Sequence, residues 1–216
     1  AEDGNVALAA RECAAGGFVR SGQSCISVQR IYVARSRYAE FVEAFVANVR
    51  EMRPDSPAAI GPMVDEAAAR RVEAVIVEAV SRGAAIACGG ERQGAYIAPT
   101  VITGATGEMT IMRNEIFGPV VAVSPVDSVD EALAEMNAVS GAIHHGIYTA
   151  NLDTAFRMSD EIKAGGVIVN GPGTWRVDHM PYGGTGTSGF GREGVRFAVE
   201  EYTEPKVIVI RPSVPR

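Results

Sequence analysis

The sequence predicts an α/β protein built around a mostly parallel β-sheet. Short apolar runs alternate along the chain with amphipathic segments of about 10–15 residues, which is the pattern of strands joined by helical crossovers. The composition is that of an ordinary globular protein, since 47% of the 216 residues are hydrophobic and 21% are charged. No internal repeat or low-complexity segment interrupts the pattern. The order of the strands within the sheet does not follow from it.

The first half of the chain is expected to contribute three helices and three strands. Apolar residues three or four positions apart define the helices, with Ser36 as the N-cap of the second helix and Asp65 as the N-cap of the third. Gly83 is expected to end the third helix. The predicted helices cover residues 3–18, 37–53 and 66–82. The predicted strands cover residues 30–33, 84–88 and 96–102.

The second half repeats the alternation and then changes character. Strands are predicted at residues 120–123, 146–149 and 167–169, and helices at 129–139 (capped by Ser128), 152–163 and 194–202. Residues 170–193 are rich in glycine and almost free of apolar runs, which indicates a long ordered loop or a site. The last apolar run, Lys206–Ile210, predicts a strand that joins either its own sheet or the sheet of a partner subunit.

Charge and cysteine content argue against several classes of function. The formal net charge is −6 and no long basic run is present, so neither non-specific nucleic-acid binding nor binding to an anionic membrane is expected. No apolar run approaches the roughly 18 residues of a membrane span. Three cysteines without CxxC spacing fit a reducing, cytoplasmic location better than a disulfide framework. Because the chain starts with Ala1 rather than methionine, we expect it to be a piece of a longer protein.

The residues around Cys25 are the first candidate for chemistry. Gly22 lies in a turn that presents Cys25 shortly before the predicted strand at residues 30–33, and that strand would hold the cysteine in place. We therefore interpret Cys25 as a nucleophile. A buried, unreactive thiol is the alternative, because free cysteine is among the most buried residue types. We expect this packing role for Cys13, inside the first helix, and for Cys88, in an apolar strand.

Three weaker patterns do not define a further site. Gly184–Gly189 match G-x-G-x-x-G, but the preceding strand ends too far upstream for a dinucleotide-binding turn, and close passage of backbone segments explains the glycines better. His144 and His145 would point to opposite faces of a strand, and no metal site is expected. A Cys25–His179 pair is conceivable as the centre of a cysteine hydrolase, although no residue at recognisable spacing would orient it.

Three motifs together resemble those of the aldehyde dehydrogenase superfamily, and the resemblance covers essentially the whole chain. Residues 22–25 (Gly-Gln-Ser-Cys) are similar to the family's nucleophile motif, and residues 115–119 (Glu-Ile-Phe-Gly-Pro) to its cofactor motif. Residues 181–184 and 188–193 are similar to its C-terminal signature. The sequences look closest to the lactaldehyde, glyceraldehyde-3-phosphate and semialdehyde dehydrogenase branch. One departure is Gly186, where the signature usually carries a lysine, and it leaves the packing of this loop open.

The resemblance implies oxidation of an aldehyde to a carboxylic acid with NAD or NADP. Cys25 would attack the aldehyde to give a thiohemiacetal and then a thioester, and the Cys25 backbone N–H would form half of an oxyanion hole. Glu115 would bind the nicotinamide ribose hydroxyls, and Phe117 would pack beside the nicotinamide. The residues implied at the substrate mouth are Ser24, Ile26, Arg176 and Tyr182.

The resemblance also implies parts that lie before residue 1. The family's general-base glutamate belongs to a Glu-Leu-Gly-Gly motif upstream of the cysteine, and the domain that holds most of the NAD or NADP is upstream too. We therefore expect residues 1–204 to be the catalytic domain and residues 205–216 to be an oligomerisation strand and tail. Lys206–Ile210 would join the subunits of a dimer or tetramer. The 216-residue chain by itself is predicted to be inactive in turnover.

Arg176 indicates a substrate class. An arginine at the substrate mouth pairs well with a carboxylate or phosphate, so we expect a short polar or anionic aldehyde. Alternatively, Arg176 forms an ion pair with Asp178 or another acidic residue and never meets the substrate. A function of another class also stays open, namely a non-catalytic assembly module that keeps the fold and oligomerises through Lys206–Ile210.

Overall fold

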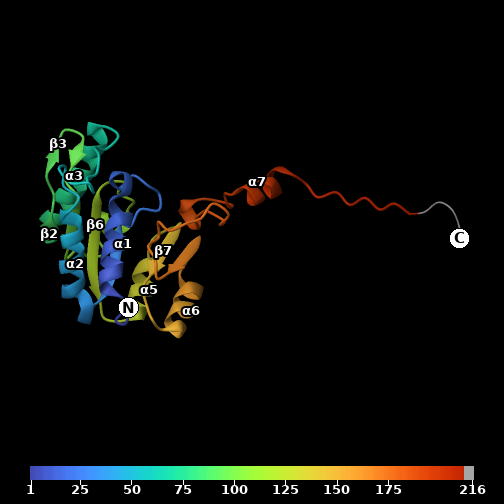
Figure 1. Cartoon of the computed structure of the whole chain (residues 1–216), viewed down its shortest axis with the longest axis horizontal. Coiled ribbons are helices and arrows are strands. Elements are labelled where there is room, and N and C mark those ends of the chain that lie inside the picture. Colours follow the sequence, from blue (N-terminus) through green and yellow to red (C-terminus); the bar gives the residue numbers. More distant parts are fainter. Residues whose placement is uncertain (212–216) are drawn as a thin grey trace.

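A four-stranded β-sheet forms the centre of the structure, a computed structural model that describes residues 1–211 (Figure 1). Strand β6 (Val120–Val126) lies inside the sheet and pairs in parallel with β1 (Arg30–Ala34) on one side and β5 (Thr100–Thr103) on the other. Strand β2 (Ala85–Cys88) pairs antiparallel with β5 and forms an edge. The predicted α/β class with a mostly parallel sheet is confirmed.

Helices cover both faces of this sheet. Val121 and Val123 of β6 belong to the core of helices α1 and α2, whereas Val120 and Ala122 belong to the core of helix α3. Because successive strand residues point to opposite faces, a strand that is apolar throughout is stable only between two covering layers. The bounds of the three helices are Val6–Phe18, Tyr38–Arg50 and Glu66–Ser81.

Two of the three predicted serine and aspartate caps are present. Asp65 accepts a hydrogen bond from Ala68 N–H at 2.7 Å, and Ser128 caps α5 (Val129–Asn137). The Ser36 prediction is wrong, because its hydroxyl donates instead to the carboxylate of Glu2. Helix α2 therefore begins without a side-chain cap.

The short 3₁₀ helices η1 and η2 cover Val19–Gly22 and Arg35–Arg37.

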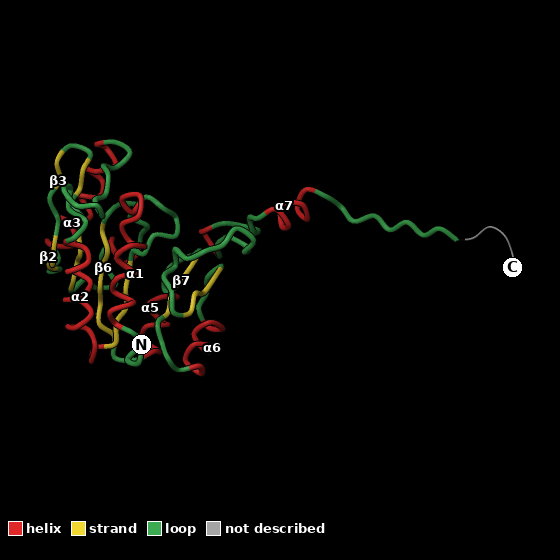
Figure 2. The backbone as a smooth tube through the Cα atoms, viewed as in Figure 1, coloured by secondary structure: helices red, strands yellow, loops and turns green. Residues whose placement is uncertain are grey.

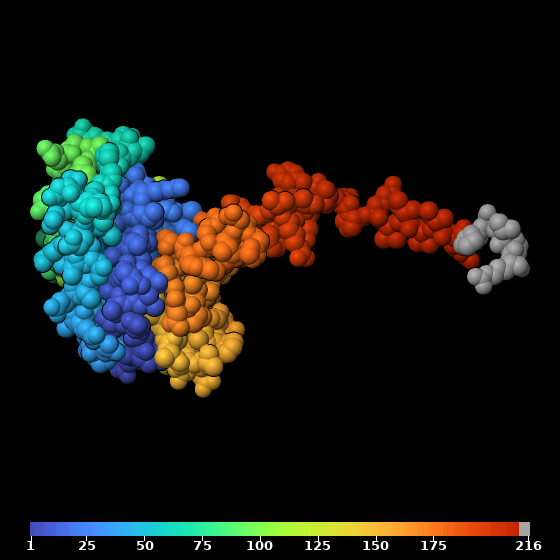
Figure 3. Space-filling model, in the orientation of Figure 1, coloured from blue at the N-terminus to red at the C-terminus, as the bar shows by residue number. Residues whose placement is uncertain are grey.

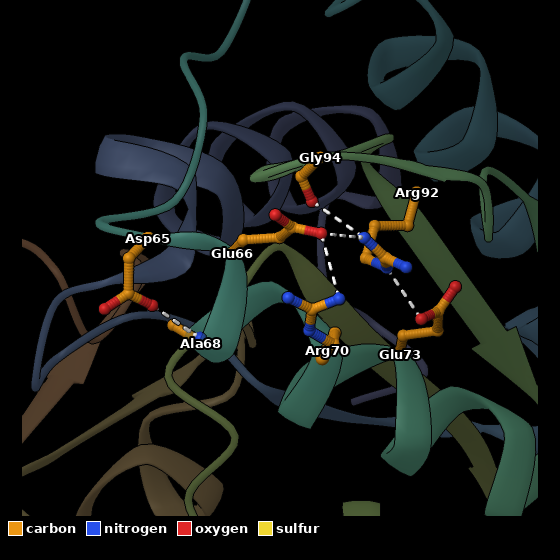
Figure 4. A network of polar contacts seen from close by, with 7 residues as sticks. All are labelled: Asp65, Glu66, Ala68, Arg70, Glu73, Arg92 and Gly94. Carbon is orange, nitrogen blue, oxygen red and sulfur yellow. Dashed lines mark hydrogen bonds and ion pairs between the residues drawn. The ribbon is translucent and has the colours of Figure 1, made fainter.

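A small hairpin is attached to the start of α3 by a polar network (Figure 4). Strands β3 (Arg92–Gln93) and β4 (Tyr96–Ile97) form it, so the segment predicted as one strand at 96–102 is divided between β4 and β5. The Arg92 guanidinium bonds Glu73 at 2.6 Å and also contacts Glu66 at 3.5 Å. A short helix that the sequence did not predict, α4 (Thr110–Arg113), follows β5.

A second, two-stranded parallel sheet lies beside the first (Figure 1). It consists of β7 (His144–Ile147) and β8 (Gly166–Val169), and helix α6 (Leu152–Glu161) connects them. A separate apolar cluster of α5, α6 and β7 side chains forms its core. Strand β7 begins two residues before the predicted segment, because its first residues are histidines rather than apolar side chains.

The end of the described chain projects from the body as an arm (Figures 1 and 3). A loop with the 3₁₀ helix η3 (Gly186–Ser188) leads to α7 (Val195–Tyr202), which has no buried residue. Figure 2 shows loop, not strand, from α7 onward. The strand predicted at Lys206–Ile210 is thus absent from residues 1–211, since a strand exists only when it is paired and this segment has no neighbour. Residues 212–216 of the predicted tail lie outside the described part.

Candidate active site

Cys25 lies on a turn whose backbone has an uncommon conformation. Arg20 and Ser21 have φ angles of 52° and 58° in the left-handed region, although neither is glycine. Gly22 follows with φ 68°, and a β-carbon there would lie only 2.1 Å from the backbone oxygen of Gly118. Only glycine fits at this position, and the close approach holds the Cys25 turn against the turn at Gly118.

The Cys25 thiol is exposed, and its side chain has one hydrogen-bond partner among the described residues. The Sγ atom lies 2.6 Å from the hydroxyl oxygen of Tyr182, and either atom can donate. Within residues 1–211 the Cys25 N–H has no acceptor, although the N–H groups of Gln23 and Ser27 on either side are both bonded. The turn therefore presents an accessible sulfur with an unused backbone donor beside it.

The other two cysteines have packing roles. Cys13 is buried in α1, and burial raises the pKa of its thiol to about 12. Cys88 is half-buried, because β2 is an edge strand, and burial raises the pKa of its thiol as well. At neutral pH these two thiols stay protonated and are poor nucleophiles. The exposed Cys25 is the reactive candidate.

Tyr182 is held in place from three directions. Its backbone pairs with that of Glu193 through two hydrogen bonds, 3.1 Å and 2.6 Å long. The guanidinium carbon of Arg176 lies 4.5 Å from the ring centroid, and the His144 ring meets the phenol edge-on at 5.5 Å. Burial, together with the hydrogen bond to Cys25, raises the pKa of the Tyr182 phenol. The phenol is therefore a neutral hydrogen-bond donor at physiological pH.

A cavity of about 360 Å³ opens beside the Cys25 thiol. The predicted mouth residues Ser24, Ile26, Arg176 and Tyr182 all line it, together with Val19, Arg20 and Thr174. Arg20 and Thr174 were not predicted, although Arg20 belongs to the same turn as the nucleophile. Among the described residues Arg176 forms no ion pair with Asp178, so that alternative is not the arrangement found. Two arginines, Arg20 and Arg176, therefore belong to the lining of the cavity that includes Cys25.

A larger cavity, about 740 Å³, also reaches Cys25 and Ile26 and includes Glu115. The Glu115 side chain is exposed, and its segment is fixed at the next residue, where Ile116 N–H donates to Gln29 Oε1 at 3.1 Å. Phe117 has φ 52° and is 38% exposed as a residue, but it does not line either cavity. Cys25 thus lies between two cavities, and the predicted cofactor residue Glu115 belongs to the second.

Histidines do not complete a catalytic pair or a metal site in the described part of the chain. His144 Nδ1 lies 2.9 Å from the backbone oxygen of Gly173, whereas His145 Nε2 is buried without a partner. These separate surroundings are those expected of neighbouring strand residues. His179 is exposed and makes no hydrogen bond to Cys25 within residues 1–211. Over the same range no cluster of three or more metal-binding side chains exists.

No described helix is long and apolar enough to cross a membrane.

Two of the three glycines of the G-x-G-x-x-G segment, Gly184 and Gly186, serve close packing as predicted, whereas a β-carbon at Gly189 would meet nothing within 4 Å. Gly186 has φ 56°, and a β-carbon there would lie 2.0 Å from the backbone oxygen of Ser140. At Gly184 a β-carbon would lie 2.5 Å from that of Ser188. The segment lies between the end of β8 and α7 and does not open a helix directly, so it lacks the geometry of a dinucleotide-binding turn.

Comparison with known proteins now identifies the family. The profile described as the aldehyde dehydrogenase family matches residues 1–208. The chain belongs to this family. The Cys25 turn, the Glu115 segment and the Tyr182 loop all lie within the matched residues.

Relatives and solved structures agree with the assignment. The chain is 42% identical over 197 residues to a 3-sulfolactaldehyde dehydrogenase from Priestia aryabhattai, which is 89% of this chain and 41% of that protein. An aldehyde dehydrogenase from Physcomitrella patens, in complex with the reaction product succinate, is 39% identical with a TM-score of 0.88, covering 95% and 43% of the two chains. The Mycobacterium tuberculosis aldehyde dehydrogenase complexed with NAD⁺ is 32% identical with a TM-score of 0.89, covering 100% and 46%. The chain spans less than half the length of each.

Proposed function

We propose that this chain carries the catalytic thiol of an NAD(P)-dependent aldehyde dehydrogenase. The observation that supports the proposal is the position of Cys25, an exposed thiol on a constrained turn between two cavities. One cavity is bordered by Arg20 and Arg176, and the other includes the carboxylate of Glu115. Such an arrangement gives the sulfur a substrate side and a separate side for a second reactant.

The Cys25 sulfur is the attacking atom in this proposal. As a thiolate it adds to the aldehyde carbon, and the carbonyl oxygen becomes the negatively charged oxygen of a thiohemiacetal. The unused Cys25 N–H is a donor for that oxygen, because it lies beside the sulfur and has no acceptor within residues 1–211. After oxidation to the thioester, water releases the carboxylic acid and restores the thiol.

The residues at the larger cavity fit a nicotinamide cofactor. Glu115 forms no ion pair with any described residue, so its carboxylate is available to accept hydrogen bonds from ribose hydroxyls. NAD or NADP, when bound, supplies the hydride acceptor for oxidation of the thiohemiacetal. Phe117 lies in the same rigid turn, two residues after Glu115, and we propose that its half-exposed ring packs beside the nicotinamide.

The remaining parts of the enzyme are proposed to lie outside residues 1–216. We propose that residues 1–204 are the catalytic domain, and that further polypeptide supplies most of the cofactor-binding surface and the base that activates water. On this proposal the 216-residue chain can form a covalent adduct at Cys25 but does not turn over. The lengths of the relatives support this division.

We propose an anionic aldehyde as the substrate. Arg20 and Arg176 border the cavity at Cys25, and Thr174 adds a hydroxyl donor. Two arginines in the lining of one cavity of about 360 Å³ suit a carboxylate, sulfonate or phosphate attached to a short aldehyde. A relative whose name specifies a sulfonated aldehyde, and a neighbour that binds the dicarboxylate succinate, support the same class.

We propose that the arm joins subunits into a homo-oligomer and that the protein acts in the cytoplasm. The arm exposes a run of apolar side chains that a single chain leaves in water: Val195, Tyr202, Val207, Ile208 and Ile210 are each 76–89% exposed. Lys206–Ile210 is proposed to pair as a strand with a partner's sheet. An assembly module without catalysis is the second candidate function, favoured only by this arm.

Oxidation of an aldehyde panel tests the proposal. The complete protein is assayed with NAD and with NADP, using lactaldehyde, succinate semialdehyde, a phosphorylated aldehyde and a neutral aldehyde, with Cys25→Ser as the control. We expect turnover that the Cys25→Ser variant loses completely. No turnover with any aldehyde and either cofactor would favour the assembly module.

The anionic substrate class is tested by the two arginines. Arg20→Ala and Arg176→Ala should each raise KM for anionic aldehydes at least about tenfold, because a charge-assisted hydrogen bond contributes about 1.5–3 kcal/mol. For a neutral aldehyde of similar length kcat/KM should stay within about twofold. Equal losses for both classes would show that the arginines do not recognise the anion.

A further inference from the structure

The Tyr182 hydroxyl bonds to the sulfur of Cys25 and, within residues 1–211, to no other group. Its oxygen lies 2.6 Å from Sγ, although Tyr182 as a residue is only 8% exposed. Tyrosine hydroxyls inside a protein usually bond to a fixed structural partner, as the Tyr38 hydroxyl does to Val123 O. A buried phenol whose partner is an accessible thiol is therefore placed where it can take part in the chemistry of that thiol.

The ring of Tyr182 stays in place whatever its hydroxyl bonds to. The Arg176 guanidinium lies 4.5 Å from the ring centroid, the His144 ring meets it edge-on, and the backbone is paired with that of Glu193. None of these contacts uses the hydroxyl, so the O–H bond can turn while the ring is held. Burial, followed by the hydrogen bond to Cys25, raises the pKa of the phenol, so the hydroxyl keeps its proton and remains a donor.

Attack by Cys25 on an aldehyde moves negative charge from sulfur to oxygen. An electron pair of the thiolate forms the bond to the carbonyl carbon, and the π electron pair of the C=O bond stays on the carbonyl oxygen. Sulfur and oxygen are then bonded to the same carbon, so a donor that touches the sulfur is also close to the new oxyanion. Cys25 and Tyr182 both belong to the lining of the smaller cavity, where the substrate is proposed to bind.

We propose that Tyr182 is a catalytic residue whose hydroxyl transfers its hydrogen bond from the Cys25 sulfur to the carbonyl oxygen as the thiohemiacetal forms. The phenol keeps its proton and its neutral charge, and nothing is oxidised or reduced in this step. When the acid is released and the thiolate leaves, the hydroxyl returns to the sulfur. The inference rests on the proposed function of Cys25 and adds a second donor for the oxyanion.

The hydroxyl and the Cys25 backbone complement one another as donors. The Cys25 N–H has no acceptor within residues 1–211, and the constrained turn fixes its position. The phenol is fixed separately, by the loop that follows β8. Donors that are already in place where charge develops stabilise a transition state strongly, and removal of one of them slows a reaction by about 100-fold to 1,000-fold.

This role differs from stabilisation of the thiolate alone. A donor that bonds only to the thiolate acts before the electrophile arrives, so it affects the reaction with every electrophile to the same degree. A donor that moves to the oxyanion stabilises the transition state further, but only where charge develops on an oxygen. Electrophiles that form an oxyanion should therefore depend on Tyr182 more than electrophiles that do not.

Two electrophiles that react with the same sulfur test the proposal. The complete protein, without NAD or NADP, is mixed with 4-nitrophenyl acetate, which acylates a thiol through an oxyanion and releases coloured 4-nitrophenolate in the first turnover. Iodoacetamide alkylates the thiol by displacing iodide, and no oxygen gains charge. We expect Tyr182→Phe to slow acylation about 100-fold and alkylation only about fivefold, so the ratio of the two rates falls about 20-fold. Tyr38→Phe should leave both rates unchanged, because its hydroxyl bonds to Val123 O.

The same experiment separates failure of this inference from failure of the proposed function. Release of 4-nitrophenolate that is equally fast in Cys25→Ser, or absent from the unaltered protein, would overturn both. If release requires Cys25 but Tyr182→Phe slows acylation and alkylation by the same factor, the phenol acts on the thiolate alone and only the inference is overturned. Faster acylation in Tyr182→Phe would also overturn it, because the phenol would then only cover the sulfur.

Discussion

Replacing Tyr182 with phenylalanine should slow the reaction of Cys25 with electrophiles. The hydroxyl lies 2.6 Å from Sγ, and as a neutral donor it bonds more strongly to a thiolate than to a thiol. Hydrogen bonds to charged groups contribute about 1.5–3 kcal/mol and neutral ones about 0.5–1.5 kcal/mol. The difference, about 1 kcal/mol, corresponds to about fivefold slower reaction of Cys25 in the variant.

Alkylation by iodoacetamide measures this effect directly. The rate at Cys25 is followed by mass spectrometry of the peptide that contains it, from pH 6 to pH 11, in the protein and in Tyr182→Phe. We expect a rate about fivefold lower at pH 7 in the variant.

The rate of Cys25 alkylation also provides the control and the result that would refute the reasoning. Tyr38→Phe is a matched control, because that hydroxyl donates to Val123 O at 3.1 Å and its loss removes a hydrogen bond elsewhere. It should leave alkylation of Cys25 unchanged. An equal or higher rate in Tyr182→Phe at pH 7 would mean that the phenol only covers the sulfur, and the reasoning from thiolate stabilisation would be refuted.

Two further predictions concern stability. Gly22→Ala should lower the free energy of unfolding, measured by urea titration, by at least about 2 kcal/mol, because Gly22 has a φ of 68° and a β-carbon there would lie 2.1 Å from Gly118 O. Gly61→Ala is the control, since a β-carbon at Gly61 would meet nothing within 4 Å. It should change the free energy of unfolding by less than about 0.5 kcal/mol. Burial, followed by the charge of Arg30, lowers the pKa of His145 to about 4 from its ordinary value of 6.5. As the pH falls, the His145 imidazole therefore takes up a proton in the unfolded chain before it does so in the folded protein. The stability present above pH 6.5 should be lost progressively as the pH falls to 4, by at most about 3 kcal/mol. His145→Leu should remove that part of the pH dependence of urea unfolding, and an unchanged difference between pH 7 and pH 4 would contradict the assignment.

Helices and their caps could be predicted from the sequence, because they depend on the pattern of neighbouring residues. Helix α3 and its cap at Asp65 follow from apolar spacing and one side chain, and both are found as predicted. Whether Lys206–Ile210 forms a strand does not follow from local pattern, because it depends on pairing with another segment. Strand β7 was placed two residues late, since pairing with β8, not apolarity, includes the two histidines.

The residues of the site that belong to contiguous motifs could be predicted from the sequence, whereas those placed by the fold could not. Cys25 and Glu115 could be selected because their motifs are contiguous in sequence. Arg20 could not, because its place beside the thiol depends on a left-handed backbone that few non-glycine residues adopt. The contact between Cys25 and Tyr182 joins residues 157 positions apart and depends on how the two sheets are packed.

The packing of the two sheets also bears on the reaction of Cys25. Cys25 belongs to the first sheet, through the turn that leads into β1, whereas Tyr182 meets His144 of β7 in the second sheet. The contact between Sγ and the phenol therefore depends on how the two sheets pack against each other.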